Sequence, residues 1–315
     1  MKQRVFAFDG GELRALALEA PGPLRWAAWN TMDGSALLVG DHGSVFEYRD
    51  GVFSSIKSGR TENLRCVEFR RNGGAAYACG NGGAVVRIDG GEVSQLRSEG
   101  RENLRRLAWN SRSVRALVVG NSGAAYILDS SEELSKVPGA ETHLRSVVWY
   151  PGDDLALVTG NCFRDSIGSL SPSPNLFELK DGVLNEVTDF EESRADLTSS
   201  SWRPGSSDCL VAGFDQTWHT PVLFSYAPSH LTALKWVGEN IFPTACSWNP
   251  TGAYALVGTS PLTGEEGLAS LWRYEVGGSM ARLADLEGFG VSCIAWKDED
   301  MALITCSRSV RAYSA

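Results

Sequence analysis

One feature constrains the fold more than any other: a pattern of short apolar runs separated by turns, first seen in residues 24–51, occurs seven times. Each copy closes its first run with an aromatic residue, and these anchor aromatics are Trp29, Phe69, Trp109, Trp149, Trp202, Trp248 and Trp296. Successive anchors are 40, 40, 40, 53, 46 and 48 residues apart. This period matches four short strands per repeat and is too long for leucine-rich or hexapeptide solenoids.

The runs within a copy are typical of strands rather than helices. In the first copy they read LRWAAW, SALLVG, SVFEYRD and VFSSIKS, each rich in aromatic and β-branched residues and bounded by turns such as Asp33-Gly34. Such turns tolerate the positive φ that tight hairpins require. Seven units of about 45 residues account for the 315-residue chain. We therefore predict an all-β fold: one domain over residues 1–315, a seven-bladed β-propeller of four-stranded antiparallel blades.

The two ends of the chain predict how the ring closes. Residues 5–18 resemble the hairpin of residues 85–98, yet they precede any first strand, whereas the last repeat has no fourth strand. We expect the N-terminal segment to join the C-terminal blade, which removes the open edges of a linear array. Residues 5–8 and 309–313 both have the pattern of a third strand, and only one can occupy that place in the closing blade.

Composition narrows the function classes. The chain carries a formal charge of -9, which disfavours nucleic acid as a partner. No apolar stretch approaches the 18 residues that a membrane span needs. The seven cysteines form no CxxC pair, so a reducing cytoplasm is the expected setting. No HExxH, Walker A or GxSxG motif is present, and we predict no cofactor, no metal and no catalytic residue.

Two segments carry a resemblance to a known group of proteins. WNPTGAYALVG, residues 248–258, and GNGGAVVRIDGG, residues 80–91, resemble repeats of the WD-repeat and related propellers, and the resemblance covers essentially the whole chain. No repeat has the Gly-His or Trp-Asp dipeptides of true WD repeats. The resemblance therefore implies the propeller architecture and no particular partner.

A periodic set of arginines forms the candidate site. Four residues before the anchor, the first four repeats carry Arg25, Arg65, Arg105 and Arg145, and the last three carry Thr198, Thr244 and Ser292. The first strand is innermost in a propeller, so we expect an arc of guanidinium groups at the channel mouth, beside the turn residues Asp41, Asn81, Asn121 and Asn161. Regular strand alternation would instead place these arginines between blades, as braces for loop carbonyls, with Glu62, Glu102 and Glu141 close enough in sequence to neutralise them. Both interpretations stay open, because clamping an anion and bracing carbonyls use the same donors.

Longer loops mark the same face. The connections between second and third strands are extended at residues 161–175, 215–221 and 259–267, and insertions gathered on one face usually mark a binding face. These loops and the neighbouring turns add His42, Phe163, Arg164, Trp218 and His219 to the predicted partner- or anion-binding residues. Trp218 either packs under its own loop or stands exposed as a partner anchor.

These observations predict a non-catalytic scaffold that binds a protein or peptide partner at the channel-mouth face, through an anionic group of the partner. One alternative is an enzyme acting on a small molecule that bears a carboxylate or phosphate, with Asp41, His42 and His143 as the nearby acid or base candidates. Another is an assembly or chaperone-like factor. Fold alone separates none of these.

Overall fold

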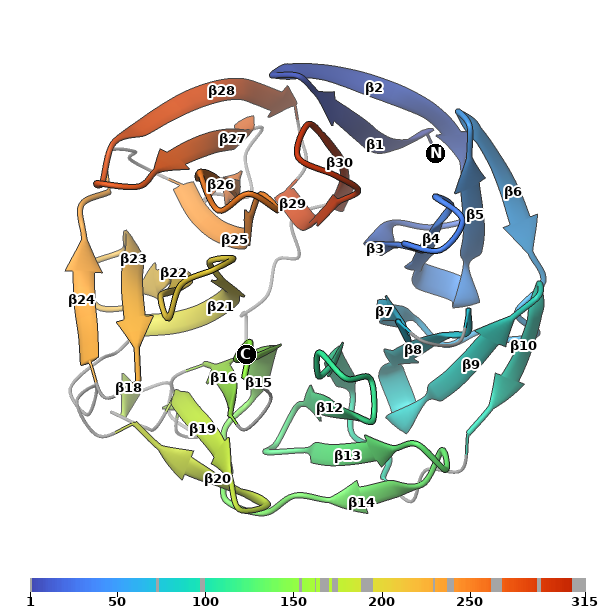
Figure 1. The fold of residues 1–315 in the computed structure, drawn as a ribbon, viewed down its shortest axis with the longest axis horizontal. Coiled ribbons are helices and arrows are strands. Elements are labelled where there is room, and N and C mark those ends of the chain that lie inside the picture. The colour runs from blue at the N-terminus through green and yellow to red at the C-terminus, as the bar shows by residue number, and fades with distance from the viewer. Residues whose placement is uncertain are drawn as a thin grey trace.

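The chain folds into a closed ring of small sheets arranged about a central axis (Figure 1). The computed structural model describes residues 2–71, 74–96, 100–152, 155–161, 163–164, 170–171, 175–187, 195–228, 230–236, 241–261, 268–287 and 290–307. Within these residues the strands form seven four-stranded antiparallel sheets and one two-stranded sheet. The predicted seven-bladed all-β propeller is confirmed. Among the residues described, no helix has both the length and the apolar character to cross a membrane.

The first three blades are the most regular. Blade 1 comprises β3 (Leu24–Trp29), β4 (Ala36–Gly40), β5 (Val45–Arg49) and β6 (Val52–Ile56), with the 3-10 turn η1 (Asp41–Gly43) between β4 and β5. Blade 2 comprises β7 (Leu64–Phe69), β8 (Ala76–Gly80), β9 (Val85–Asp89) and β10 (Glu92–Gln95), with the turn η2 (Asn81–Gly83). Blade 3 comprises β11 (Leu104–Trp109), β12 (Arg115–Gly120), β13 (Ala125–Asp129) and β14 (Leu134–Lys136).

Blades 4 to 6 have longer strands or extra elements. Blade 4 comprises β15 (Leu144–Trp149), β16 (Ala156–Gly160), β19 (Leu176–Lys180) and β20 (Val183–Glu186), and a small hairpin of β17 (Phe163–Arg164) and β18 (Leu170–Ser171) lies between β16 and β19. Blade 5 comprises β21 (Ala195–Trp202), β22 (Cys209–Asp215), β23 (Thr220–Ala227) and β24 (His230–Leu234). Blade 6 comprises β25 (Ile241–Trp248), β26 (Tyr254–Pro261), β27 (Leu268–Glu275) and β28 (Met280–Glu287).

Both ends of the chain build blade 7, as the sequence predicts. The C-terminal strands β29 (Gly290–Trp296) and β30 (Met301–Ser307) pair with the N-terminal strands β1 (Lys2–Asp9) and β2 (Glu12–Glu19) in the order β2-β1-β30-β29. The register pairs Val5 with Thr305 and Asp9 with Met301, so residues 5–8 take the third-strand place. Residues 309–313, the other candidate for that place, lie outside the described residues.

The hydrophobic core is divided among the interfaces between blades. Among the described residues there are seven clusters of buried apolar side chains, and each combines residues from two neighbouring blades. The second strand of each blade is covered on both faces, so β4 reads ALLVG without alternation and all five residues are buried. The outer strand β6, at the rim, is mostly exposed. No blade completes a core alone, so stability depends on closing the ring.

Four of the anchor tryptophans link their blade to the one before it through the indole N–H. The indole N–H of Trp29 donates to the carbonyl of Ala295 at 3.0 Å, and that of Trp149 donates to the carbonyl of Ala108 at 2.8 Å. Trp202 and Trp296 make the same bond, again to the residue before the preceding anchor. The bond from Trp29 joins blade 1 to blade 7 and so contributes to closing the ring.

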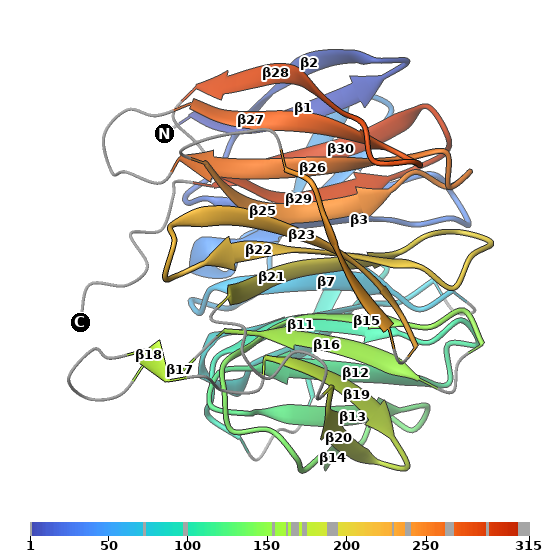
Figure 2. The same cartoon turned by 90° about the vertical axis from the view of Figure 1, so that its left-hand side faces the viewer.

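The turns between second and third strands share one face with the loops that enter each blade. The amide of Gly83 donates to the carbonyl of Glu102 at 2.9 Å, across the interface between blades 2 and 3. Gly83 has φ +72°, and a Cβ there would come within 2.0 Å of the Gly100 carbonyl oxygen, so only glycine fits. The β17–β18 hairpin also projects on the side of the ring where these turns lie (Figure 2).

Candidate functional site

A β-bulge in every first strand positions the candidate site. The register between first and second strands shifts at the residue four before the anchor in all seven blades, for example between Leu24 and Trp26 and between Leu64 and Cys66. A bulge leaves one residue outside the ladder and re-aims its side chain. The expectation that regular alternation directs this position between blades is therefore wrong, because the bulge interrupts the alternation at that residue.

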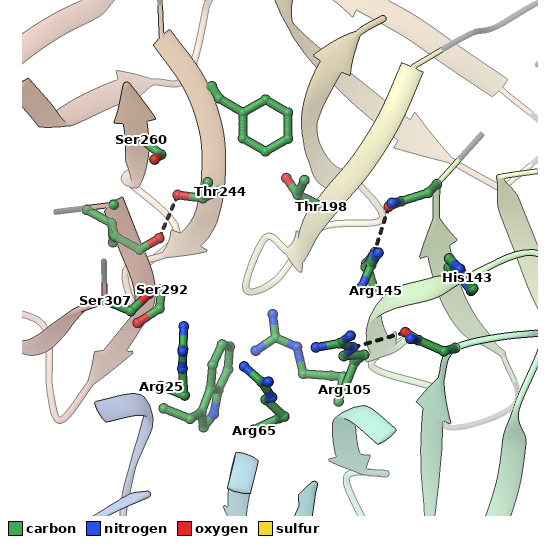
Figure 3. Close-up of a pocket in the computed structure, with 17 residues that line it drawn as sticks. Arg25, Arg65, Arg105, His143, Arg145, Thr198, Thr244, Ser260, Ser292 and Ser307 are labelled. Carbon is green, nitrogen blue, oxygen red and sulfur yellow. Dashed lines mark hydrogen bonds between the residues drawn. The ribbon is translucent and has the colours of Figure 1, made fainter. Parts of the chain in front are cut away.

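The re-aimed side chains line a cavity of about 470 Å³ at the channel mouth, which we call the mouth cavity. Figure 3 shows the arginines of blades 1 to 4 on one side and the hydroxyl residues of blades 5 to 7 on the other. All seven predicted positions line it, namely Arg25, Arg65, Arg105, Arg145, Thr198, Thr244 and Ser292. Arg106 is a fifth arginine in the lining, and none of the described lining residues is Asp or Glu.

Each arginine of the arc is held by a turn residue of its own blade, sixteen positions later. The Nε of Arg65 donates to Oδ1 of Asn81 at 3.1 Å. Arg105 makes the same bond to Asn121 at 3.0 Å, and Arg145 makes it to Asn161 at 2.9 Å (Figure 3). Side-chain amides of the turns are thus bracing partners of these three arginines. These bonds use Nε and fix the guanidinium planes with their Nη ends toward the channel.

Arg25 differs from the other three because its turn partner is charged. Its Nε and Nη2 donate to the two carboxylate oxygens of Asp41 at 2.9 and 2.6 Å, a bidentate pair whose side chains are 14% and 12% exposed. Asp41 therefore neutralises the charge of Arg25, whereas Asn81 carries no charge to offset that of Arg65. Of the glutamates expected as neutralising groups, Glu62 pairs instead with Arg60 at 3.0 Å.

The hydroxyl side of the mouth is structural. Thr198 donates to the carbonyl of Pro243 in the next blade at 2.8 Å, and Thr244 donates to that of Val291 at 2.5 Å. Ser292 Oγ lies 3.1 Å from the Thr305 carbonyl oxygen. Each bulge residue on this side thus bonds to backbone.

Burial and mutual repulsion set the electrostatics of the arc. Burial lowers the pKa of Arg65, and the charges of Arg25 and Arg145 lower it further against the opposing charge of Asp41. Burial also lowers the pKa of His143, as do Arg145 and Arg105. His143 accepts the amide N–H of Ser122 on Nδ1 at 2.8 Å, so the neutral ring carries its proton on Nε2. An anion in the mouth would relieve the repulsion that both shifts reflect.

The remaining predicted residues fall into three groups. His42 is exposed on η1, has φ 57°, and is not part of the mouth lining. The backbone of Phe163 and Arg164 forms β17, and their side chains lie outside the described part of the structure. Trp218 is 76% exposed, so it does not pack under its loop.

The turn that presents Trp218 is tied to the mouth. Asp215 Oδ1 accepts the amide N–H groups of Thr217 and Trp218 at 2.7 and 2.9 Å, which fixes the turn between β22 and β23. The adjacent His219 ring lies 6.1 Å from that of Phe214, and Phe214 lies 5.1 Å from Phe242, a residue of the mouth lining. A path of aromatic contacts thus leads from the exposed turn to the mouth cavity.

The sequence reasoning missed two residues deep in the channel. Arg106 is 8% exposed, and its Cζ lies 3.4 Å from the centroid of the Trp26 ring. Both line the mouth cavity. They occupy the position three before the anchor, where the other repeats carry Cys66, Ser146, Ser199, Ala245 and Cys293. A cation and a large aromatic at a position otherwise filled by small side chains is the signal that could have identified them.

Comparison with known proteins supports the fold and leaves the partner open. No protein-family model matches the chain, and no curated protein matches it in sequence. Among solved structures, a chain in the crystal structure of a mitotic checkpoint complex is similar, with a TM-score of 0.68 and 15% identity over 100% of this chain and 96% of that one. This protein is thus a seven-bladed β-propeller whose architecture is like that of WD-repeat propellers.

Proposed function

We propose that this propeller is a non-catalytic interaction scaffold that binds a protein or peptide partner through a carboxylate placed in the mouth cavity. The observation that carries the proposal is Arg65. Its Nε is held by Asn81, and its Nη groups have no partner among the described residues while they line the cavity. A planar pair of donors fixed by a neutral amide is suited to bidentate contact with a carboxylate.

The surroundings of the mouth favour a peptide over a small molecule. Trp218 stands exposed on a turn tied to the mouth lining, and a large exposed aromatic beside a polar pocket is typical of a hot spot in a protein interface. A peptide can place an acidic side chain or its C-terminal carboxylate in the mouth while an apolar residue packs on Trp218. The similar chain is part of a mitotic checkpoint complex, which is a protein assembly and agrees with a role in protein binding.

The candidate acids and bases support an enzyme poorly. Both carboxylate oxygens of Asp41 accept hydrogen bonds from Arg25, so the carboxylate is already occupied by a structural partner. His42 is not part of the mouth lining, and the Nδ1 of His143 is occupied by the Ser122 amide. An assembly or chaperone-like role would use the same mouth and the same exposed tryptophan.

The proposed setting is a reducing compartment such as the cytoplasm. The cysteines at positions 66, 79, 209, 246, 293 and 306 are free thiols, and all six are buried. Burial raises the pKa of Cys246 and of Cys293 to about 12, which keeps both thiols protonated and unreactive at neutral pH. These cysteines act as small apolar core residues.

The test is a titration of the protein with fluorescent acidic peptides, each with a free C-terminus and one large apolar residue. We expect Arg65→Gln to weaken binding about 10- to 100-fold, because a hydrogen bond to a charged group contributes about 1.5–3 kcal/mol. The unfolding midpoint should stay near that of the wild type, since Gln retains hydrogen-bonding ability. The loss should shrink as salt is raised, since ions screen the attraction.

Two further variants complete the design. Arg49→Gln removes the same charge at a surface pair with Asp33, where the arginine side chain is 46% exposed, and should bind as the wild type does. Trp218→Ala should weaken peptide binding with little change in stability, because that side chain is 76% exposed. Binding that is equally strong in Arg65→Gln and in the wild type would refute the proposed role of the mouth.

A further inference from the structure

A second cavity occupies the channel on the other side of Arg106 and Trp26. It measures about 480 Å³ and is lined by residues from the first strands of all seven blades, and we call it the distal cavity. Arg106 and Trp26 line both cavities, so their stacked side chains form the partition between them. The carboxylate site of the mouth cavity lies entirely on the mouth side of this partition.

Arg106 is the unusual group in the distal cavity. Its side chain is 8% exposed, and its Nη1 is buried without an acceptor among the described residues. No ion pair of Arg106 occurs within the described structure. A buried guanidinium donor without an acceptor is costly, since buried polar groups are almost always hydrogen-bonded. The arrangement is expected where a ligand supplies the missing acceptor.

Serine hydroxyls from two neighbouring blades face the same cavity with donors. Ser199 Oγ accepts the amide N–H of Cys246 at 3.0 Å, and Ser146 Oγ accepts that of Ser200 at 3.2 Å. Ser146 and Ser200 also share a bond between their hydroxyls at 3.0 Å. Each of these backbone N–H groups thus occupies one acceptor site on a serine oxygen. The side chain of Ser199 also contacts the Cys246 thiol, a weak acceptor, and this hydrogen bond lowers the pKa of the thiol against the larger effect of burial. One hydroxyl hydrogen of the Ser146–Ser200 pair has no acceptor among the residues described.

We propose that the distal cavity binds a small oxyanion, the carboxylate or phosphate group of a small molecule, through the guanidinium of Arg106 and the hydroxyl of Ser199. The chemistry is that of a fixed cation with a buried donor that has no acceptor among the described residues, beside serine hydroxyls that can donate to the same ligand. Trp26 holds the guanidinium plane by stacking, and this fixes the direction of the donors.

One acidic group in the cavity wall tunes this site. Burial raises the pKa of Glu68 to about 7, while Arg106, the Trp26 indole and Arg71 lower it. Near neutral pH the Glu68 carboxyl group therefore exists in both forms. Its charged form repels an incoming anion, and its protonated form offers another donor. Anion binding at Arg106 should strengthen as the pH falls through about 7, with uptake of a proton by Glu68.

The test is calorimetric titration of the full chain with inorganic phosphate and with acetate, at about one pH unit below and above the Glu68 pKa. We expect Ser199→Ala to weaken binding about threefold and Arg106→Gln to weaken it at least about tenfold. Glu68→Gln keeps the size of the side chain and removes its charge. The Glu68→Gln protein should therefore bind acetate more tightly than the wild type at the higher pH, and its acetate binding should no longer depend on pH between the two test values.

The experiment also needs a variant of the mouth cavity as a control, because phosphate can bind in that cavity too. In Arg65→Gln, binding that still depends on Ser199 and Glu68 supports the distal site even if the proposed function at the mouth fails. If Arg65→Gln abolishes anion binding and Ser199→Ala leaves it unchanged, the anion binds in the mouth cavity and the inference is overturned. So would a wild-type protein that takes up neither probe. If Arg106→Gln does not fold, the Ser199 and Glu68 variants decide the outcome.

Discussion

Replacing Trp149 by Phe tests whether the anchor indoles hold neighbouring blades together. Trp149 is 9% exposed, and its N–H donates to the carbonyl of Ala108 in the preceding blade at 2.8 Å. Phe keeps an aromatic ring in the interface and removes the donor. The chain offers a matched control in Trp109, which occupies the same position one blade earlier. The Nε1 of Trp109 is buried without an acceptor among the described residues.

Both substitutions replace an indole by the smaller phenyl ring. Only Trp149→Phe also removes a hydrogen bond, whereas Trp109→Phe removes a buried N–H group that has no acceptor among the described residues. A lost hydrogen bond costs about 1 kcal/mol of unfolding free energy, and removing a buried donor that has no acceptor relieves about 1–3 kcal/mol. An arginine lies over each indole ring, so the two sites also match in this cation–π contact. The Cζ of Arg115 is 4.9 Å from the Trp149 ring centroid, and the Cζ of Arg70 is 5.3 Å from that of Trp109. We therefore expect Trp149→Phe to be more destabilising than Trp109→Phe by at least about 2 kcal/mol.

The assay is urea unfolding of both variants and the wild type at one temperature, with the unfolding free energy extrapolated to water. Equal m values would show that the comparison concerns the native state. If the two variants lose the same unfolding free energy within about 0.5 kcal/mol, the indole bond contributes nothing measurable, and the anchor indoles do not hold neighbouring blades together through their N–H groups.

Two further predictions concern ring closure and pH. Deleting residues 1–18 removes the strand that pairs with β30 from Val5–Thr305 to Asp9–Met301, so hydrogen exchange of residues 290–307 should accelerate; unchanged protection there would show that the blade closes without β1. Because burial raises the pKa of Glu68 to about 7 in the folded chain, the native state holds the proton more tightly than the unfolded state. Stability should therefore fall as the pH rises from about 4.5 to about 7 and then level off. Glu68→Gln should remove this slope in urea unfolding at several pH values and raise stability above pH 7 by up to about 3 kcal/mol, and a slope that persists would assign it to another group.

The sequence alone determined the number of blades, their strands and the way the ring closes. These follow from local patterns: an aromatic anchor at each of seven positions, turns that need positive φ, and apolar runs of strand length. The N-terminal hairpin could be assigned to the last blade because it has strands without a first strand of its own. The arc of Arg25, Arg65, Arg105 and Arg145 was also visible as a period in the sequence.

Only the tertiary structure decided what those arginines do. Their direction depends on a bulge in the ladder between β3 and β4 and its equivalents, and a one-residue register shift leaves no clear mark in composition or alternation. The replacement of a neutral amide by Asp41 was visible in the sequence, but its bidentate contact with Arg25 depends on the fold of the turn.

The distal cavity was beyond sequence reasoning for the same physical reason. Arg106, Glu68 and Ser199 belong to three different blades and meet only because the ring brings seven first strands around one channel. Burial that shifts a pKa, or leaves a donor without an acceptor, is a property of that closed ring. Local pattern thus determined which strands form, and ring closure determined which of their side chains share a cavity.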